Sequence, residues 1–402
     1  MEEFQMESFK KEEQIKKLDN VTLVLGNGFD LHNKLKTSYN DFFEAVKKEK
    51  YKRIINEFNR GDNDILNHIL NNNSYLVTNR ISLPFLSDCN VWDIVFALET
   101  ATNTNFGPYI RWADIEKTIL KWMNDEMINV HKYLLDTGKY TKSISKSDFV
   151  YKVKFVAAII TYKNRSNPLT TSDDFYRYLL NELIKFETEF GEYIQKETDR
   201  VYGSNNELAY QAINKIVPFD HISTLASFNY NDYYNNRIQD KLHHINGGIN
   251  DHPIFGIDPS LLTDTSKDDP RIIFGKTYRR LMLDASVKSM TQKKPSNNII
   301  IYGHSLNEQD YNYFFALFDD IDLADHTKDN KIIFAYSIHD ENRRIRITST
   351  LIDNITKMFY NYSEYLGRVK DNNRLLDMLV VTKKIMLLEI PEESKNENNE
   401  LN

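Results

Sequence analysis

Apolar positions divide the chain into three zones with different periodicities. The first zone, residues 1–58, opens with a polar leader and then a short apolar run, VTLVL at 21–25. This run is mostly apolar and begins with a β-branched residue. It therefore predicts a strand buried on both faces, as in a parallel sheet covered by helices. Helical character follows near 38–57, where Ser38 is expected to be the N-cap and Asp41 an acidic variant of the capping box.

The second zone, residues 59–218, carries helical spacing over most of its length. Apolar residues recur there at three- and four-residue intervals, which place them on one face of a helix. The stretch 60–74 is rich in asparagine and is expected to be a loop, and strand alternation is suggested only near 150–161. This zone therefore predicts a large helical insertion between the strands of one sheet. The helical spacing is clearest in residues 92–98, 112–122 and 175–190.

Strand patterns return in the third zone, residues 219–390, and alternate there with helical stretches. Such alternation implies a parallel sheet. The predicted fold is therefore α/β, a Rossmann-like parallel sheet with the helical insertion, followed by a polar tail, residues 391–402, that is expected to be disordered. The expected strands are residues 222–228, 241–245, 253–257, 298–303 and 331–337, and the expected helices lie near 276–292, 308–320 and 340–360.

Composition and charge narrow the class of protein. The 402 residues are 41% hydrophobic and carry a formal net charge of −7, which is ordinary for a globular protein and argues against a broad nucleic-acid surface. The single cysteine, Cys89, excludes an intramolecular disulfide and fits a reducing compartment. Residues 1–20 are charged, unlike a signal peptide, and no apolar run approaches the roughly 20 residues of a membrane helix. We therefore expect a cytoplasmic protein with no membrane partner.

The first strand stops at Gly26-Asn27-Gly28, and the two glycines there raise the first functional question. Glycine has no Cβ, so the backbone can turn tightly and a ligand can approach it closely. The amides of such a loop, together with a helix N-terminus, form an anion site, for which a nucleotide phosphate is a natural ligand. A tight turn with no ligand explains the same glycines equally well. The dinucleotide-binding fingerprint is incomplete, because Leu31 stands where its third glycine would be.

Three further polar or glycine-containing motifs follow predicted strands. The carboxyl ends of parallel strands share one edge of a sheet, so all four motifs are expected to converge there as a ligand site. Ordinary structural roles stay open as alternatives. Asn229 is a common type of turn residue, and His243 and His244 would fit as packed strand residues. Gly303 and Ser305 would fit a helix connection. The four motifs are GNGFD (26–30), SFNYND (227–232), HHINGG (243–248) and IYGHSL (301–306).

These motifs resemble those of a known family. LVLGNGFDLHNKLKTSYNDF, SFNYND, HHINGG followed by IFGID, and IIIYGHSLNEQD are similar in order and spacing to the blocks of the AbiH family of bacterial abortive-infection proteins. The WADIE stretch, residues 112–116, also resembles a family feature. The resemblance covers most of the chain and implies a role in phage defence, with a phage-derived trigger and a second copy of the chain as candidate partners.

AbiH proteins in turn are similar to sirtuin-like NAD-binding domains. In such a domain a glycine loop holds the dinucleotide phosphates and the nicotinamide ribose, and Gly26 and Gly28 match that loop. An Asn-Tyr-Asp or Asn-Ile-Asp block follows. Asn229 matches its asparagine, whereas Asp232 is displaced by one place from the position of its aspartate.

The later blocks of the sirtuin-like pattern match less evenly. Gly303 and Ser305 match a Gly-x-Ser block near the adenosine ribose. Where the pattern has His-Gly with a catalytic histidine, this chain has Asn246-Gly247. Because side chains alternate along a strand, His244 would point to the same face as Asn246. Either His244 serves in place of the missing histidine, or the histidine step is absent.

The resemblance implies that NAD or a related nucleotide is the ligand, and that NAD could also be the substrate of a glycohydrolase. Asn229 would then orient the ribose hydroxyls or the attacking water, and His244 would act as general base, with Asp232 beside them. A nucleotide-binding sensor that does not cleave its ligand stays open, as does a nuclease, and no metal is predicted. The expected ligand-binding residues are Gly26, Asn27, Gly28, Phe29, Asp30, Asn246, Gly247, Gly303, His304 and Ser305.

Overall fold

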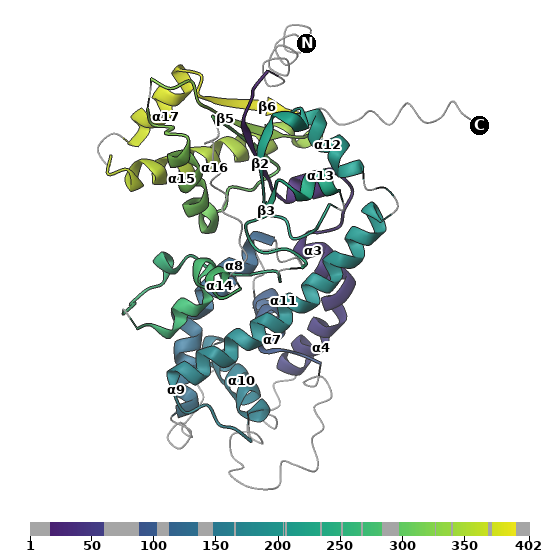
Figure 1. Ribbon diagram of the computed structural model, residues 1–402. Helices are drawn as coiled ribbons and strands as arrows, with labels where there is room; N and C mark the ends of the chain where they lie inside the picture. Colours follow the sequence, from purple (N-terminus) through teal and green to yellow (C-terminus); the bar gives the residue numbers. More distant parts are fainter. Residues whose placement is uncertain are drawn as a thin grey trace, which may run out of the picture. The chain divides into compact units, whose positions relative to one another are not determined.

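The computed structural model places two compact units within the chain (Figure 1). Unit 1 comprises residues 1–37, 194–249 and 286–402, and unit 2 comprises residues 38–193 and 250–285. The structure describes residues 17–59, 88–102, 112–135, 148–164, 166–203, 205, 207–233, 235–250, 252–266, 268–283, 297–325, 327–338, 341–368 and 372–390. The expected loop at 60–74 and the expected disordered tail at 391–402 lie outside these residues.

Unit 1 is built on a six-stranded sheet with the order β3-β2-β1-β4-β5-β6. Every neighbouring pair is parallel, so all six carboxyl ends lie at the same edge. This order is that of a doubly wound Rossmann sheet, in which the strand order reverses between β1 and β4. The predicted α/β fold with a parallel sheet is confirmed. The strands are β1 (Val21–Leu25), β2 (Ile222–Ser227), β3 (Leu242–His244), β4 (Asn298–Tyr302), β5 (Lys331–Tyr336) and β6 (Ile385–Glu389).

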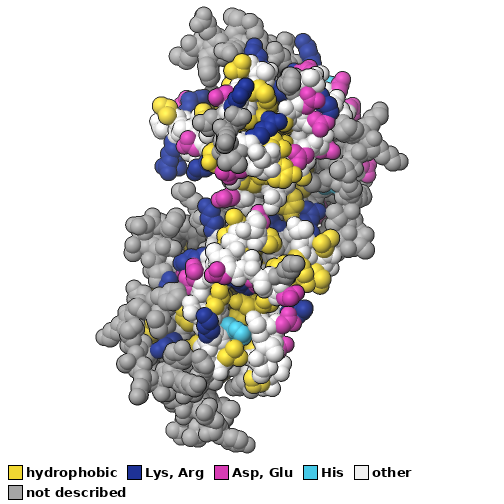
Figure 2. Space-filling model, turned by 90° about the vertical axis from the view of Figure 1, so that its left-hand side faces the viewer, with side chains coloured by type: hydrophobic (Ala, Val, Ile, Leu, Met, Phe, Trp, Pro, Cys, Tyr) yellow, Lys and Arg dark blue, Asp and Glu magenta, His cyan; other side chains and the backbone are white. Residues whose placement is uncertain are grey.

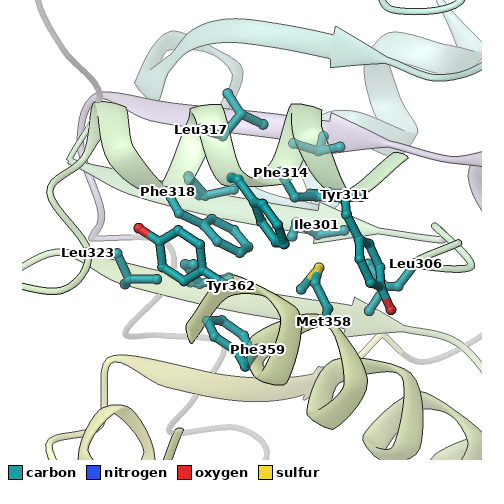
Figure 3. Close-up of a cluster of buried hydrophobic side chains, with 14 of the residues drawn as sticks. Ile301, Leu306, Tyr311, Phe314, Leu317, Phe318, Leu323, Met358, Phe359 and Tyr362 are labelled. Atoms are coloured by element: carbon teal, nitrogen blue, oxygen red, sulfur yellow. The ribbon is translucent and has the colours of Figure 1, made fainter. Parts of the chain in front are cut away.

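Helices cover both faces of this sheet, which explains why its strands are apolar on both sides. On one face Ile213 and Ile238 pack with Leu23 and Leu225 of the inner strands. On the other face three helices bury a cluster of aromatic residues against β4 and β5, including Phe318 (Figure 3). The helices of unit 1 are α2 (Asn27–His32), α12 (Leu208–Ile216), α13 (Asn236–Gln239), α15 (Tyr311–Asp320), α16 (Arg344–Tyr365) and α17 (Asn372–Val381), with short 3₁₀ turns at Phe219–His221, Glu308–Asp310 and Glu341–Arg343.

Unit 2 is helical in its described residues. Its longest helix, α11 (Ser172–Tyr202), continues from Ile194 onward as part of unit 1. The remaining elements are α3 (Tyr39–Phe42), a π-helical turn (Phe43–Lys47), α4 (Lys48–Asn59), α7 (Val91–Thr102), α8 (Trp112–Lys121), a second π-helical turn (Trp122–Glu126), α9 (Met127–Leu135), α10 (Asp148–Lys163), 3₁₀ turns at Pro259–Leu261 and Pro270–Phe274, and α14 (Lys276–Leu283).

Several local predictions for these helices hold. Ser38 caps α3, and its side chain and that of Asp41 form the reciprocal capping box. The long amphipathic helix predicted from 175–190 is present within α11. The helix predicted from 276 begins there as α14 and is described to residue 283.

Buried ion pairs support the interior of unit 2. Lys47 is fully buried and its Nζ lies 2.6 Å from Asp93 Oδ1. Glu187, also fully buried, accepts two hydrogen bonds from the guanidinium of Arg279 and a third from Phe255 N–H at 2.6 Å. Each of these pairs joins segments that are distant in sequence, so they fix how the helices of this unit pack.

Two strand predictions are wrong and one strand was not predicted. Residues 253–257 form only an isolated bridge, Ile257 to Gly275, because Pro253 lacks an amide hydrogen and Phe255 N–H donates to a side chain. Residues 150–161 lie in α10. The unpredicted strand is β6, which pairs with β5 at the edge of the sheet and is only partly buried.

The described surface carries charges of both signs. On the face drawn in Figure 2, Lys and Arg side chains are interspersed with Asp and Glu side chains. No helix within the described ranges combines the length and the apolar character that crossing a membrane requires.

Candidate functional site

The glycine turn after β1 packs directly against the loop after β4. The amides of Gly26 and Gly28 donate to the carbonyl oxygens of Tyr302 and Gly303, at 2.9 and 2.8 Å. A Cβ on Gly28 would lie 2.7 Å from Gly303 Cα, and Gly303 itself has φ of +69°. The glycines are therefore required for close approach of one backbone to another. In this structure both amides are engaged by the protein itself rather than open to a phosphate, and α2, with six residues, is short.

Asn229, in the loop after β2, is held by its amide nitrogen. Nδ2 lies 3.0 Å from Gly26 O, 3.0 Å from Asp30 Oδ1 and 3.4 Å from the hydroxyl of Tyr233. The backbone amide of Asn229 donates to Ser227 Oγ at 3.1 Å, which fixes the turn itself. Among the described residues no hydrogen bond is donated to Asn229 Oδ1. The side chain is thus oriented so that Nδ2 donates to protein acceptors, whereas Oδ1 accepts no hydrogen bond from the described residues.

Asp30 lies beneath Asn229 and is almost completely buried, at 1% exposure. Its Oδ1 accepts from Asn229 Nδ2, and its Oδ2 lies 3.0 Å from the hydroxyl of Thr37. That hydroxyl also lies 2.8 Å from Asn27 Oδ1. Burial raises the pKa of the Asp30 carboxyl to about 7, against the opposing effect of hydrogen bonds from Thr37, Asn231 and Asn229.

His244 sits at the end of β3 beside the same loop. Its Nδ1 lies 2.9 Å from Asn229 O, and its Nε2 lies 3.2 Å from Asp232 Oδ1. The ring is packed so closely that a Cβ on Gly248 would lie 2.8 Å from its Cδ2. Both ring nitrogens therefore face oxygen acceptors, and a neutral imidazole can donate to only one of them.

Asn246 lies two residues after His244, in the turn that follows β3. Its side chain is buried, and its Oδ1 has no hydrogen-bond partner among the described residues. Gly247 follows with φ of +78°, in the left-handed region that glycine adopts readily. An unpaired buried acceptor is costly, and Asn246 Oδ1 is the second carboxamide oxygen, after that of Asn229, without a donor among the described residues.

The remaining expected ligand-binding residues have other contacts. Phe29 is fully buried, with its ring edge-on to those of Tyr233 and Tyr302. His304 Nδ1 accepts a hydrogen bond from Leu306 N–H at 2.9 Å, and its Nε2 lies 3.5 Å from Asp310 Oδ2. These contacts hold the core and the loop after β4 in shape.

Ser305 is exposed in the loop after β4. Its carbonyl oxygen accepts a hydrogen bond from Asn354 Nδ2 at 3.1 Å. This bond joins the loop after β4 to α16. Of the four motifs, the first three contribute polar groups to the cluster and the fourth contributes the backbone on which the glycine turn rests.

Sequence reasoning missed three members of the cluster. Thr37, Asn231 and Tyr233 all lie against Asp30 or Asn229, and each is buried. Thr37 belongs to the LKTSY block that the family resemblance singles out, so a signal for it was present. Tyr233 follows directly after the SFNYND motif, but its hydroxyl position could not be read from a pattern.

The fold and this site define a class of protein: a doubly wound α/β domain with a buried polar cluster at the carboxyl edge of its sheet, where such domains bind ligands. Among the described residues no group of three or more His, Cys, Asp or Glu side chains could hold a metal ion.

The model of one family, described as bacteriophage abortive infection AbiH, matches residues 22–336. The chain belongs to the AbiH family. This match runs from β1 to the end of β5 and includes every residue of the cluster. No curated protein and no solved structure matches the chain.

Proposed function

We propose that this AbiH-family chain acts in abortive infection by binding NAD or a related nucleotide at the carboxyl edge of its parallel sheet. The strand order supports a nucleotide, because doubly wound sheets of this order bind nucleotides at that edge. The observation that carries the proposal is the orientation of Asn229. Its amide nitrogen is fixed by Gly26 O and Asp30, so its oxygen is an acceptor prepared for a hydroxyl group of a ligand.

A ribose supplies such hydroxyl groups, and Asn246 offers a second acceptor for one of them. Two carboxamide oxygens suit a ligand that is rich in donors, whereas the phosphates must find other partners. Because the amides of Gly26 and Gly28 already have protein acceptors, we propose that the glycine turn supports the site and that the phosphates bind elsewhere.

Cleavage of NAD is the catalytic form of the proposal. The bond between nicotinamide and ribose breaks through an oxocarbenium-like transition state, so the site must orient the sugar and present a water. Asn229 Oδ1 would orient the ribose or the water, and His244, paired with Asp232, would accept the proton. For this step the imidazole must first expose one nitrogen, because both now face protein oxygens.

That engagement of both nitrogens favours a second candidate, a sensor that binds the nucleotide without cleaving it. In the sensor, His244 and Asp232 hold the loop after β2 in place, and binding of the ligand changes the interaction with a partner.

The test begins with calorimetric titration of the purified full chain with NAD and with ADP-ribose, followed by chromatography of the products. We expect Asn229→Ala to weaken binding about tenfold, the loss of one well-oriented hydrogen bond. Asn361→Ala is the matched control, since Nδ2 of that half-buried asparagine donates to Lys357 O within its own helix. Release of nicotinamide that is lost in His244→Ala would establish the hydrolase, and binding without release would establish the sensor. A folded wild-type chain that binds neither compound would refute both.

A further inference from the structure

We propose that Asp30 is a positioning residue that carries a proton in the folded chain and acts through Asn229. Its effect on a ligand rests on the proposed function, whereas the proton itself does not. The residue touches no open surface, since it is 1% exposed, so any role towards a ligand must pass through a neighbour.

With the Asn27 carboxamide oriented so that Oδ1 faces Thr37, the geometry around Thr37 accommodates an additional proton. A threonine hydroxyl has one hydrogen to donate, yet Thr37 Oγ1 lies 2.8 Å from Asn27 Oδ1 and 3.0 Å from Asp30 Oδ2. If Asp30 is protonated on Oδ2, it donates to Thr37, and Thr37 donates to Asn27. Every polar atom of this chain of bonds is then satisfied, which buried polar groups require.

The opposite oxygen of the carboxyl performs the positioning. Asp30 Oδ1 accepts from Asn229 Nδ2 at 3.0 Å, and a protonated acid retains that acceptor. The bond prevents the carboxamide of Asn229 from turning its nitrogen towards the ligand. A proton on Oδ2 and an acceptor on Oδ1 thus give Asn229 one orientation.

The groups around Asp30 come from three elements. Thr37 lies in the segment after α2, Tyr202 comes from the end of α11, and Asn229, Asn231 and Tyr233 come from the loop after β2. Burial, and then the charge on Asp30, raises the pKa of both tyrosine hydroxyls. These five groups are uncharged near pH 7, as the two tyrosines stay protonated. None of these five groups would compensate the charge of an ionised Asp30, and burial raises its pKa.

Two further titratable groups, Asp232 and His244, lie beside the loop that holds Asn229. Asp232 follows in the same loop and contributes to the raised pKa of Tyr233. Its carboxylate lies 3.2 Å from His244 Nε2, so this charge is directed at the imidazole. The proton on Asp30 is therefore a property of the buried pocket beneath Asn229 and not of the pair beside it.

Protonation of Asp30 makes the stability of the fold depend on pH in a defined direction. The pKa in the folded chain is raised from 3.8 to about 7, so the folded chain keeps a proton that the unfolded chain releases in that window. The stabilisation is complete below about pH 4 and is lost as pH rises towards 7. One such proton changes the unfolding equilibrium constant about tenfold per pH unit.

Urea unfolding of the full chain between pH 5 and pH 7 measures this dependence. We expect Asp30→Asn, which mimics the neutral acid, to fold. Its unfolding free energy should fall less steeply with pH than that of wild type, and the difference in slope should correspond to the release of about one proton. Asp353→Asn is the control, because it removes the same charge from an exposed position of α16 in the same unit. Equal slopes in wild type and Asp30→Asn would overturn the proposal.

Positioning is measured separately, with NAD as the probe at pH 6. Asp30→Asn should bind NAD within about twofold of wild type, whereas Asp30→Ala should weaken binding to the level of Asn229→Ala, with no further loss in the double variant. Additive losses would contradict a role through Asn229. If wild type binds no NAD, the proposed function fails, and the same double-mutant cycle on the unfolding constant decides whether Asp30 holds Asn229. If Asp30→Ala does not fold, Asp30→Glu, which displaces the acceptor, takes its place in the cycle.

Discussion

At the scale of single residues, the glycine motifs serve the backbone. The sequence left open whether Gly26 and Gly28 make room for a ligand or for a tight turn, and the structure shows that they make room for the loop after β4. A pattern reports that a Cβ is absent and cannot report which neighbour needs the space. Asn229 and His244 do lie together at the carboxyl edge, because parallel strands bring their carboxyl ends together.

Gly303→Ala tests the close approach of the two loops. The added Cβ would lie 2.6 Å from Phe29 N at a φ of +69°, so we expect a loss of at least about 3 kcal/mol in the free energy of unfolding. Gly367→Ala shares the positive φ, +71°, but meets nothing within 4 Å, and should cost only about 1 kcal/mol. Equal losses in chemical denaturation would show that the packing against the glycine turn contributes nothing.

At the scale of elements, hydrophobic runs predicted strands correctly where the backbone amides and carbonyls bond to a neighbouring strand. β1, β2, β4 and β5 were predicted to within a residue or so, since each is an apolar run flanked by turns. The run at 253–257 is also mostly apolar, yet the amide of Phe255 donates to Glu187, a partner that no local pattern contains. β6 was missed because IMLLE has few β-branched residues and lies half-exposed at an edge.

Glu187→Ala tests how much a buried carboxylate contributes to unit 2. The substitution leaves Arg279, 5% exposed, and the amide of Phe255 without their acceptor. We expect a loss of roughly 3–5 kcal/mol in unfolding free energy, because an unpaired buried charge is costly. Glu192→Ala, at an exposed position of the same helix, should change stability by less than about 0.5 kcal/mol in the same denaturation assay. Similar values for the two variants would contradict the importance of this ion pair.

At the scale of the whole molecule, the fold class could be predicted from the sequence, whereas the order of the strands in the sheet could not. Alternating strands and helices indicate a parallel sheet, but the order β3-β2-β1-β4-β5-β6 depends on pairings between distant segments. The last of these strands lies beyond residue 336, where the family match ends. The sixth strand therefore completes the sheet outside the matched region.

Removing residues 385–402 tests whether the sheet needs this strand. The deletion takes away β6, the ladder with β5 and the ion pair between Arg344 and Glu389, 2.6 Å long. We expect the thermal unfolding midpoint to fall by at least about 5 °C, with increased aggregation from the exposed edge of β5. A shorter deletion, residues 391–402, retains β6 and is the control. An unchanged midpoint in the longer deletion would show that β5 can be an edge strand.

The pairing of β1 also governs when the site can form during synthesis. Val21 pairs with Ile222 on one side and with Asn298 on the other. At about 5–20 residues per second, a ribosome needs roughly 10–40 seconds after making β1 to supply β2. Over that interval the central strand has neither neighbour, and a chain released before residue 298 lacks the loop on which the glycine turn rests. A chain released before residue 303 therefore lacks the carbonyl groups that hold the glycine turn, whose Gly26 in turn orients Asn229.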